Sequence, residues 1–148
     1  RKEDVQGKIV FFNYPMQPQL VFDGYGDAVA YRLFSAIEAA KMGATGVLIR
    51  SVTHAMDDYP HTGVLLYEDT ITKIPAMACS TKDAEWLSAL LKKEKNVTMY
   101  MRMNCKRLPD VKSYNVIGEI KGSEKPEEII TCGGHLDSWD SGEGAHDD

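Results

Sequence analysis

A histidine and an aspartate near the end of the chain have the spacing of a metal ligand and its supporting carboxylate. His135 and Asp137 follow a short apolar run, residues 129–132. On an extended backbone, side chains two residues apart point to the same side of the chain. A carboxylate beside an imidazole orients the ring and makes it a better metal ligand. Asp147 comes after a glycine-containing segment, and such a loop can bring a second carboxylate to the same ion.

The distribution of charge favours a cation site in this region. Residues 127–148 hold seven acidic side chains and no Lys or Arg, although the whole chain has a net charge of only −5. The alternative is a solvated polar loop after an edge strand, because His-x-Asp and Asp-Asp are weak patterns by themselves. The order of strand, Gly-Gly, His-x-Asp, glycine-rich loop and Asp-Asp favours the metal site.

A second group of polar residues lies in the middle of the chain. His54 and His61 flank Asp57 and Asp58, and side chains of these types can bind a metal ion. Surface loops are generally composed of the same residues, so we favour a polar surface loop over a second metal site.

The cysteines and one asparagine are the remaining candidates. Cys79, Cys105 and Cys132 are an odd number without CxxC spacing, which does not predict a zinc cluster or a disulfide framework. Three buried thiols are the favoured interpretation, and one disulfide of undetermined pairing is the alternative. Asn96 begins an Asn-Val-Thr triplet, the acceptor pattern for N-glycosylation.

Apolar runs and helical periodicity predict an α/β fold that would position these residues. The N-terminal strand is residues 9–12, and a loop follows to Gly26. Asp27 can cap a helix to about Met42, which Gly43 ends. Further strands are predicted at residues 47–49 and 74–79, separated by a long polar loop. Ser80 can then cap a second helix that has Asp83 at its third position and lysines at its end.

The pattern changes after the second helix. Residues 97–103 alternate between apolar and polar, which predicts a strand with one buried face. Residues 107–110 form a break and a candidate domain boundary. Short strands are expected at 114–120 and 129–132, but we expect the chain after Val111 to pack poorly by itself. The prediction is therefore an α/β unit over residues 1–107 and the beginning of a second unit over 108–148.

Composition excludes several classes of protein. The chain has 148 residues, of which 43% are hydrophobic and 26% charged, as in ordinary globular domains and unlike disordered or fibrous chains. Its acidic balance and the absence of a basic cluster make nucleic acid an improbable partner. No apolar run is long enough to span a bilayer, so no membrane span is expected.

The C-terminal pattern resembles the first metal-binding motif of the M28 peptidases, a family of dizinc aminopeptidases and carboxypeptidases. The stretches that carry this resemblance are Gly134-His135-Leu136-Asp137-Ser138-Trp139-Asp140 and Gly142-x-Gly144-Ala145-x-Asp147-Asp148. Residues 1–107 resemble the protease-associated domain that precedes the catalytic domain in members of this family. Supporting stretches there include Gly7-Lys8-Ile9-Val10 and Pro60-His61-Thr62-Gly63.

The resemblance implies specific roles for the C-terminal residues. His135 is implied to be a terminal ligand of one zinc ion, and Asp147 to bridge two zinc ions. Asp137 would orient His135 without binding metal. Asp148 would follow the bridging residue at an unusual cis peptide bond.

The resemblance also implies an activity that this chain cannot perform alone. The resemblance implies hydrolysis of small peptides, with dipeptides as the expected substrates. It implies a location in the secretory pathway, outside the cell or in lysosomes. A homodimer of the intact parent is compatible with the family. The family needs further ligands and a general base downstream of Asp148, so a truncated α/β zinc-peptidase domain without them should be inactive. The alternatives are a non-catalytic protease-associated binding module and a non-cleaving relative that retains the first motif.

Overall fold

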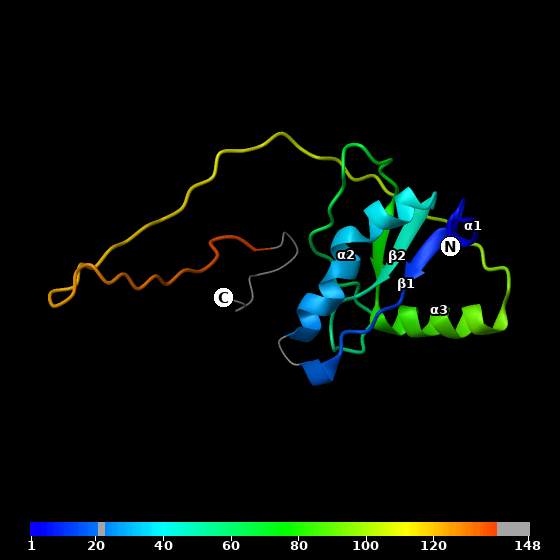
Figure 1. Cartoon of the computed structure of the whole chain (residues 1–148), viewed down its shortest axis with the longest axis horizontal. Helices are drawn as coiled ribbons and strands as arrows, with labels where there is room; N and C mark the ends of the chain where they lie inside the picture. Colours follow the sequence, from blue (N-terminus) through cyan, green and yellow to red (C-terminus); the bar gives the residue numbers. More distant parts are fainter. Residues whose placement is uncertain (21–22, 139–148) are drawn as a thin grey trace. The chain divides into compact units, whose positions relative to one another are not determined.

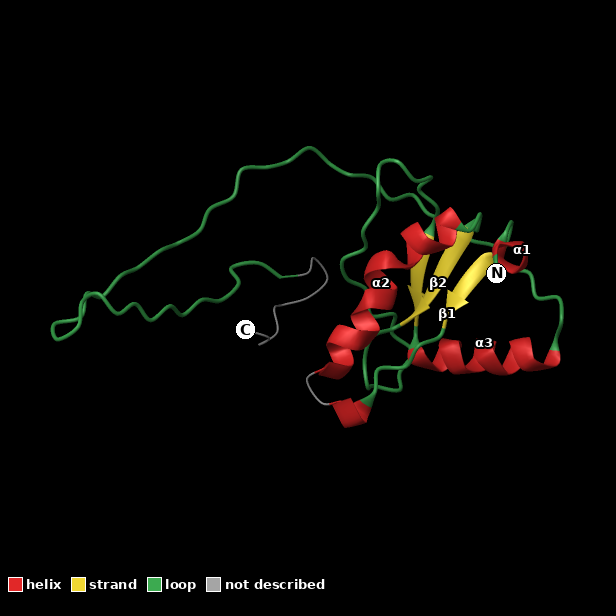
Figure 2. Ribbon diagram, in the orientation of Figure 1, coloured by secondary structure: helices red, strands yellow, loops and turns green. Residues whose placement is uncertain are grey.

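Three parallel strands and two long helices form the folded part of the chain. The computed structural model describes residues 1–20 and 23–138. Figures 1 and 2 show the elements in order: α1 (Lys2–Val5), β1 (Ile9–Phe12), the 3-10 helix η1 (Pro18–Leu20), α2 (Asp23–Lys41), β2 (Gly46–Arg50), β3 (Ala76–Cys79) and α3 (Thr81–Lys93). The α/β class and the three strands before Ser80 therefore agree with the prediction from sequence.

The sheet has the order β1-β2-β3, and both pairs of strands are parallel. Every residue of the central strand β2 is buried. Such burial explains the continuous apolar run Val47, Leu48 and Ile49, because a central parallel strand is covered on both faces. Alternate residues of β2 face opposite sides of the sheet.

The two long helices cover opposite faces of this sheet. Val47 and Ile49 pack with Ala36 and Ala39 of α2. Leu48, the residue between them, packs with Ala84 and Leu87 of α3. Each buried methylene group stabilises the fold by about 0.8 kcal/mol. Burial of the side chains in these two clusters is therefore the main force that holds the layers together.

The ends of the helices follow the rules of local capping. The Ser80 hydroxyl accepts a hydrogen bond from the backbone N–H of Asp83 at 3.0 Å, so α3 begins where the sequence predicted. Gly43 ends α2 with φ of 82°, a left-handed conformation that glycine adopts without steric cost. Its carbonyl accepts a hydrogen bond from the Gly7 N–H at 2.8 Å.

The beginning of α2 was predicted incorrectly. The helix starts at Asp23 rather than after Asp27, and it contains Gly24 and Gly26. A Cβ atom on Gly24 would lie 2.6 Å from the backbone oxygen of Gln17. The helix therefore packs against the segment that leads into η1, and this tertiary contact overrides the poor helix propensity of glycine.

Residues 97–103 do not form the predicted strand, since no helix or strand is assigned between Glu94 and Arg107. Two of their apolar residues nevertheless pack against the protein. Val97 packs against the cluster under α3, and the Met101 sulfur lies 3.1 Å from the position that a Cβ on Gly46 would take. Val97 and Met101 are partly buried, but Met99 and Met103 are exposed, so the alternation identified only two covered positions and could not supply a strand to pair with.

The contacts of the chain separate residues 1–106 from a second unit that begins at Arg107. Residues 107–138 contain no helix or strand, so the strands predicted at 114–120 and 129–132 are wrong. Ile117 and Ile129 are 88% and 86% exposed. A strand is stable only when a neighbour pairs with it, and the described part of this unit contains none. The exposure agrees with the expectation that this segment packs poorly by itself.

None of the helices within residues 1–20 and 23–138 is long and apolar enough to cross a membrane.

Candidate metal centre

His135 and Asp137 are hydrogen-bonded to each other in the second unit. The Nδ1 atom of His135 lies 3.1 Å from Oδ1 of Asp137. The side chains are 64% and 88% exposed, so both are accessible to solvent. The hydrogen bond from His135 holds the pKa of the Asp137 carboxyl below its ordinary value, and a backbone hydrogen bond adds to this effect.

This arrangement fits the chemistry of a zinc ligand. When Nδ1 of His135 donates its proton to the carboxylate, the neutral ring carries its lone pair on Nε2. That tautomer is the one in which a histidine binds zinc while a carboxylate orients it. His135 would therefore hold the metal through Nε2, and Asp137 would keep the ring in the required tautomer.

The second carboxylate of the predicted site cannot be placed. Asp147 and Asp148 lie outside the described residues, so their assignment as bridging ligand and neighbouring residue stays a prediction. Within residues 1–20 and 23–138, no group of three or more His, Cys, Asp or Glu side chains could hold a metal ion.

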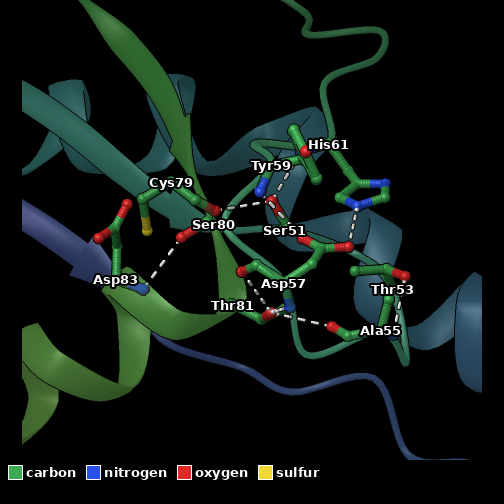
Figure 3. Close-up of polar contacts among 10 residues, drawn as sticks. All are labelled: Ser51, Thr53, Ala55, Asp57, Tyr59, His61, Cys79, Ser80, Thr81 and Asp83. Carbon is green, nitrogen blue, oxygen red and sulfur yellow. Dashed lines mark hydrogen bonds and ion pairs between the residues drawn. The ribbon is translucent and has the colours of Figure 1, made fainter.

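The loop that contains His54 and His61 is held by hydrogen bonds to the end of β2 and to the start of α3 (Figure 3). The His61 ring lies 3.1 Å from the Asp57 carboxylate, and the His61 N–H donates to Ser51 Oγ at 2.8 Å. Asp57 N–H donates to Thr81 Oγ1 at 2.9 Å, and this hydroxyl donates to the Ala55 carbonyl. Ser51 and Thr81 therefore fasten the loop to β2 and to the first turn of α3.

The carboxylates of this loop already have polar partners. Asp57 accepts hydrogen bonds from the His61 ring and from the Tyr59 N–H, and these bonds hold the pKa of the Asp57 carboxyl below its ordinary value. Asp58 pairs with Lys82 at 2.8 Å. Asp57 therefore stabilises a turn of its own loop, and Asp58 joins the loop to α3.

Two residues of this network could not have been identified from the sequence. No sequence spacing predicts the contacts of Ser51 and Thr81. These residues can hold the loop because parallel pairing places the end of β2 beside the end of β3. The Ser51 hydroxyl donates to the Cys79 carbonyl at 2.6 Å. Only the strand order brings these positions together, since 28 residues separate them in the chain.

The prediction of three buried thiols is correct for one cysteine. Cys79 is buried, whereas Cys105 and Cys132 are exposed, and all three are free. Burial raises the pKa of the Cys79 thiol. The two exposed cysteines lie after Lys93, in parts of the chain that form no regular element, so no second layer of structure covers them.

Comparison with known proteins gives independent evidence about the second unit. The model of the family described as "Peptidase family M28" matches residues 115–148, the region that contains His135 and Asp137. A crystal structure of a peptidase M28 precursor from Shewanella amazonensis is similar, with a TM-score of 0.58 and 37% sequence identity. That similarity covers 60% of this chain and 20% of the other.

The chain is therefore similar to the M28 peptidases, and residues 115–148 match the model of that family. The particular protein that it resembles along its whole length is carboxypeptidase Q. Identity is 43% to the protein of Xenopus laevis and 40% to that of Homo sapiens, in each case over all 148 residues. The chain spans 30% of the length of these curated relatives.

Proposed function

We propose that the chain is a segment of a dizinc metallopeptidase, similar to carboxypeptidase Q, whose intact form hydrolyses small peptides such as dipeptides. The observation that carries this proposal is the hydrogen bond between His135 and Asp137, which lies inside the region matched by the M28 family model. A carboxylate-oriented histidine is a common supporting arrangement at zinc sites.

In this proposal each residue of the motif has a separate role. His135 holds one zinc ion, Asp147 bridges two, Asp137 orients His135, and Asp148 follows the bridging ligand. When bound, two zinc ions would supply Lewis-acid chemistry, the activation of water and the polarisation of a peptide carbonyl. Asp137 contributes by keeping the Nδ1 proton of His135 in place, so that the ring presents the same nitrogen to the metal throughout.

The first unit is proposed to be a protease-associated domain. Its support is the three-stranded α/β architecture of residues 1–106 and the similarity to carboxypeptidase Q across the whole chain. We also propose that the intact protein passes through the secretory pathway to the cell exterior or to lysosomes, as a monomer or a homodimer.

Glycosylation of Asn96 would support the secretory assignment. Asn96 is exposed, in the segment just after α3, so a glycan there would not displace packed side chains. We expect mass spectrometry to find a glycan on Asn96 when the intact protein is made in a eukaryotic secretory pathway. An unmodified Asn96 would remove this support and leave the zinc proposal unaffected.

The roles of the motif residues can be separated in the intact parent protein. His135→Ala should remove zinc from one site and abolish peptide hydrolysis, and Asp147→Ala should be at least as damaging because a bridging carboxylate serves both ions. Asp137→Ala should lower kcat/KM by about 10- to 100-fold, as expected for a residue that acts through a ligand. Zinc content by atomic emission and dipeptide hydrolysis are the two measurements.

A matched control is available in the same unit. Asp110 pairs with Arg107 at 3.2 Å on the surface, outside the motif, so Asp110→Ala should leave both zinc content and activity unchanged. If Asp137→Ala lost zinc from both sites as completely as Asp147→Ala, the division between orienting and bridging residue would be wrong. The isolated 148-residue chain should hydrolyse no dipeptide, and zinc-dependent cleavage by it would contradict the need for further ligands.

A further inference from the structure

Two adjacent basic residues occur at three places in the chain, and the structure gives one of these pairs a different backbone from the other two. The pairs are Arg1-Lys2, Lys92-Lys93 and Lys106-Arg107. The first pair is at the start of α1, and the second is in the last turn of α3. The third pair lies in residues 94–122, where no helix or strand is assigned (Figure 2).

The backbone around Lys106-Arg107 has no partner in the described chain. Within residues 1–20 and 23–138, no N–H or C=O group of residues 102–112 forms a backbone hydrogen bond, and none of these residues belongs to a core cluster. Proteolysis is concentrated in exposed segments of this kind. Another protein can therefore bind this backbone as an extended strand without unfolding the core.

The side chains of this segment present positive charge to solvent. Lys106 is exposed, and the side chain of Arg107 is 88% exposed. Arg102, five residues before Arg107, is exposed as well. Arg107 pairs with Asp110 at 3.2 Å, but a surface ion pair is weak in water, so the guanidinium can exchange this partner for another carboxylate. Adjacent cations of this kind are complementary to acidic subsites.

The Lys92-Lys93 pair has similar charges but a different backbone. It belongs to α3, and directly after it the Glu94 N–H donates to the Leu90 carbonyl at 2.9 Å. The last turn of α3 would have to unfold before this pair could lie extended in the cleft of another protein. The two pairs therefore provide a comparison in which the charge is similar and the accessibility of the backbone differs.

We propose that Lys106-Arg107 is a processing site, cleaved after Arg107 by an endopeptidase that selects paired basic residues. Water adds to the carbonyl carbon of Arg107, and the bond from this carbon to the Leu108 nitrogen breaks. The products are a carboxylate on Arg107 and a protonated amine on Leu108, and no electron is transferred. The cut lies within one residue of the boundary at Lys106, so the first product keeps every helix and strand of the described chain. The proposal does not depend on the zinc site.

The test is digestion of the folded 148-residue chain by a purified subtilisin-like proprotein convertase, an enzyme that cleaves after Lys-Arg pairs. We expect mass spectrometry to show the first cut between Arg107 and Leu108, with no early cut at Lys92-Lys93 or at the single Lys112. Lys106→Gln with Arg107→Gln should lower the initial rate by at least about 100-fold, because the acidic subsites of the enzyme are left without partners.

The same chemical change in α3 is the control. Lys92→Gln with Lys93→Gln should leave the rate of the first cut unchanged, since this pair is not accessible in the folded chain. The intact parent should be cut at the same bond, because boundaries between domains lie in exposed segments. A first cut elsewhere, equal rates for the Lys106/Arg107 variant and the wild type, or a resistant intact parent would each overturn the proposal. A slower first cut in the Lys92/Lys93 variant would overturn it too, because recognition would then depend on the helical pair.

Discussion

Two imidazole–carboxylate pairs in this chain have the same separation but different surroundings. His61 with Asp57 and His135 with Asp137 each have a nitrogen–oxygen distance of 3.1 Å. Asp57 is also bound to the Tyr59 N–H inside a loop that Thr81 fastens to α3. Distance alone therefore does not distinguish a structural pair from a candidate ligand pair. The difference lies in the surrounding segment: the loop of Asp57 and His61 is fastened to Ser51 and Thr81, whereas His135 and Asp137 lie in a part of the chain without helix or strand.

The structural role of Asp57 can be tested through the pH dependence of unfolding. The pKa of the folded-state carboxyl lies below its ordinary value of 3.8, so ionised Asp57 stabilises the fold above that value. This contribution is lost as the pH falls through the lowered pKa. Asp57→Asn keeps an oxygen for the Tyr59 N–H but removes the charge, so the variant should lose less stability on acidification than the wild type.

Urea unfolding from about pH 5 to about pH 2 measures this difference. The difference in stability between wild type and Asp57→Asn should shrink toward the acid end. His61→Gln removes the main partner of the carboxylate, and it should therefore reduce the same pH dependence with Asp57 still present. Parallel pH profiles for wild type and Asp57→Asn would show that the pair does not stabilise the loop.

At the scale of elements, α2 shows how a tertiary contact extends a helix through glycines. Gly24 is buried, and the backbone of Gln17 approaches it closely. Gly26, two residues later in the same helix, has no neighbouring atom within 4 Å of the position of a Cβ. The two glycines therefore occupy the same kind of backbone but have opposite surroundings.

The same substitution at these two positions should have opposite effects. Gly24→Ala inserts a methyl group 2.6 Å from the Gln17 oxygen and should destabilise the fold by about 1–3 kcal/mol. Gly26→Ala should stabilise it by about 0.5–1 kcal/mol, because alanine loses less backbone freedom in a helix. Thermal or urea unfolding gives both values, and Gly26→Ala serves as the control. Destabilisation of equal size at both positions would indicate that the contact with Gln17 has no role.

At the scale of the whole molecule, the two units differ in what holds them together. Residues 1–106 contain both core clusters and all the helices and strands of the described chain. Residues 107–138 expose large apolar side chains such as Val111 and Ile120, which are 88% and 100% exposed. The chain spans 30% of the length of its curated relatives, so these side chains are candidates for burial in the rest of a larger domain.

Limited proteolysis should distinguish the two units. Trypsin should cut first at exposed basic residues such as Lys112 and Lys121, because cleavage needs a segment that is locally unfolded. Arg32 lies within α2, bonded to the Tyr25 hydroxyl at 2.9 Å, and should be cut much later. Mass spectrometry of early digestion products identifies the order. A first cut at Arg32 would contradict a stable first unit.

Features that depend on local chemistry could be predicted from the sequence. The side-chain cap at Ser80, the left-handed Gly43 and the apolar run of β2 were predictable because each depends on residues close together in the chain. The contact of His135 with Asp137 is also local, since only one residue separates them in the chain.

Other features depend on how separate elements pack, which local patterns do not specify. The backbone of Gln17 lies against Gly24 in the first turn of α2, and the anchoring of the His61 loop depends on Ser51 and Thr81. Residues 97–103 have the alternation of a strand but no strand to pair with, since periodicity specifies a buried side and pairing needs a second backbone. A bridging role for Asp147 likewise requires a fold that brings its carboxylate to His135. The spacing in the sequence permits that approach but does not fix it.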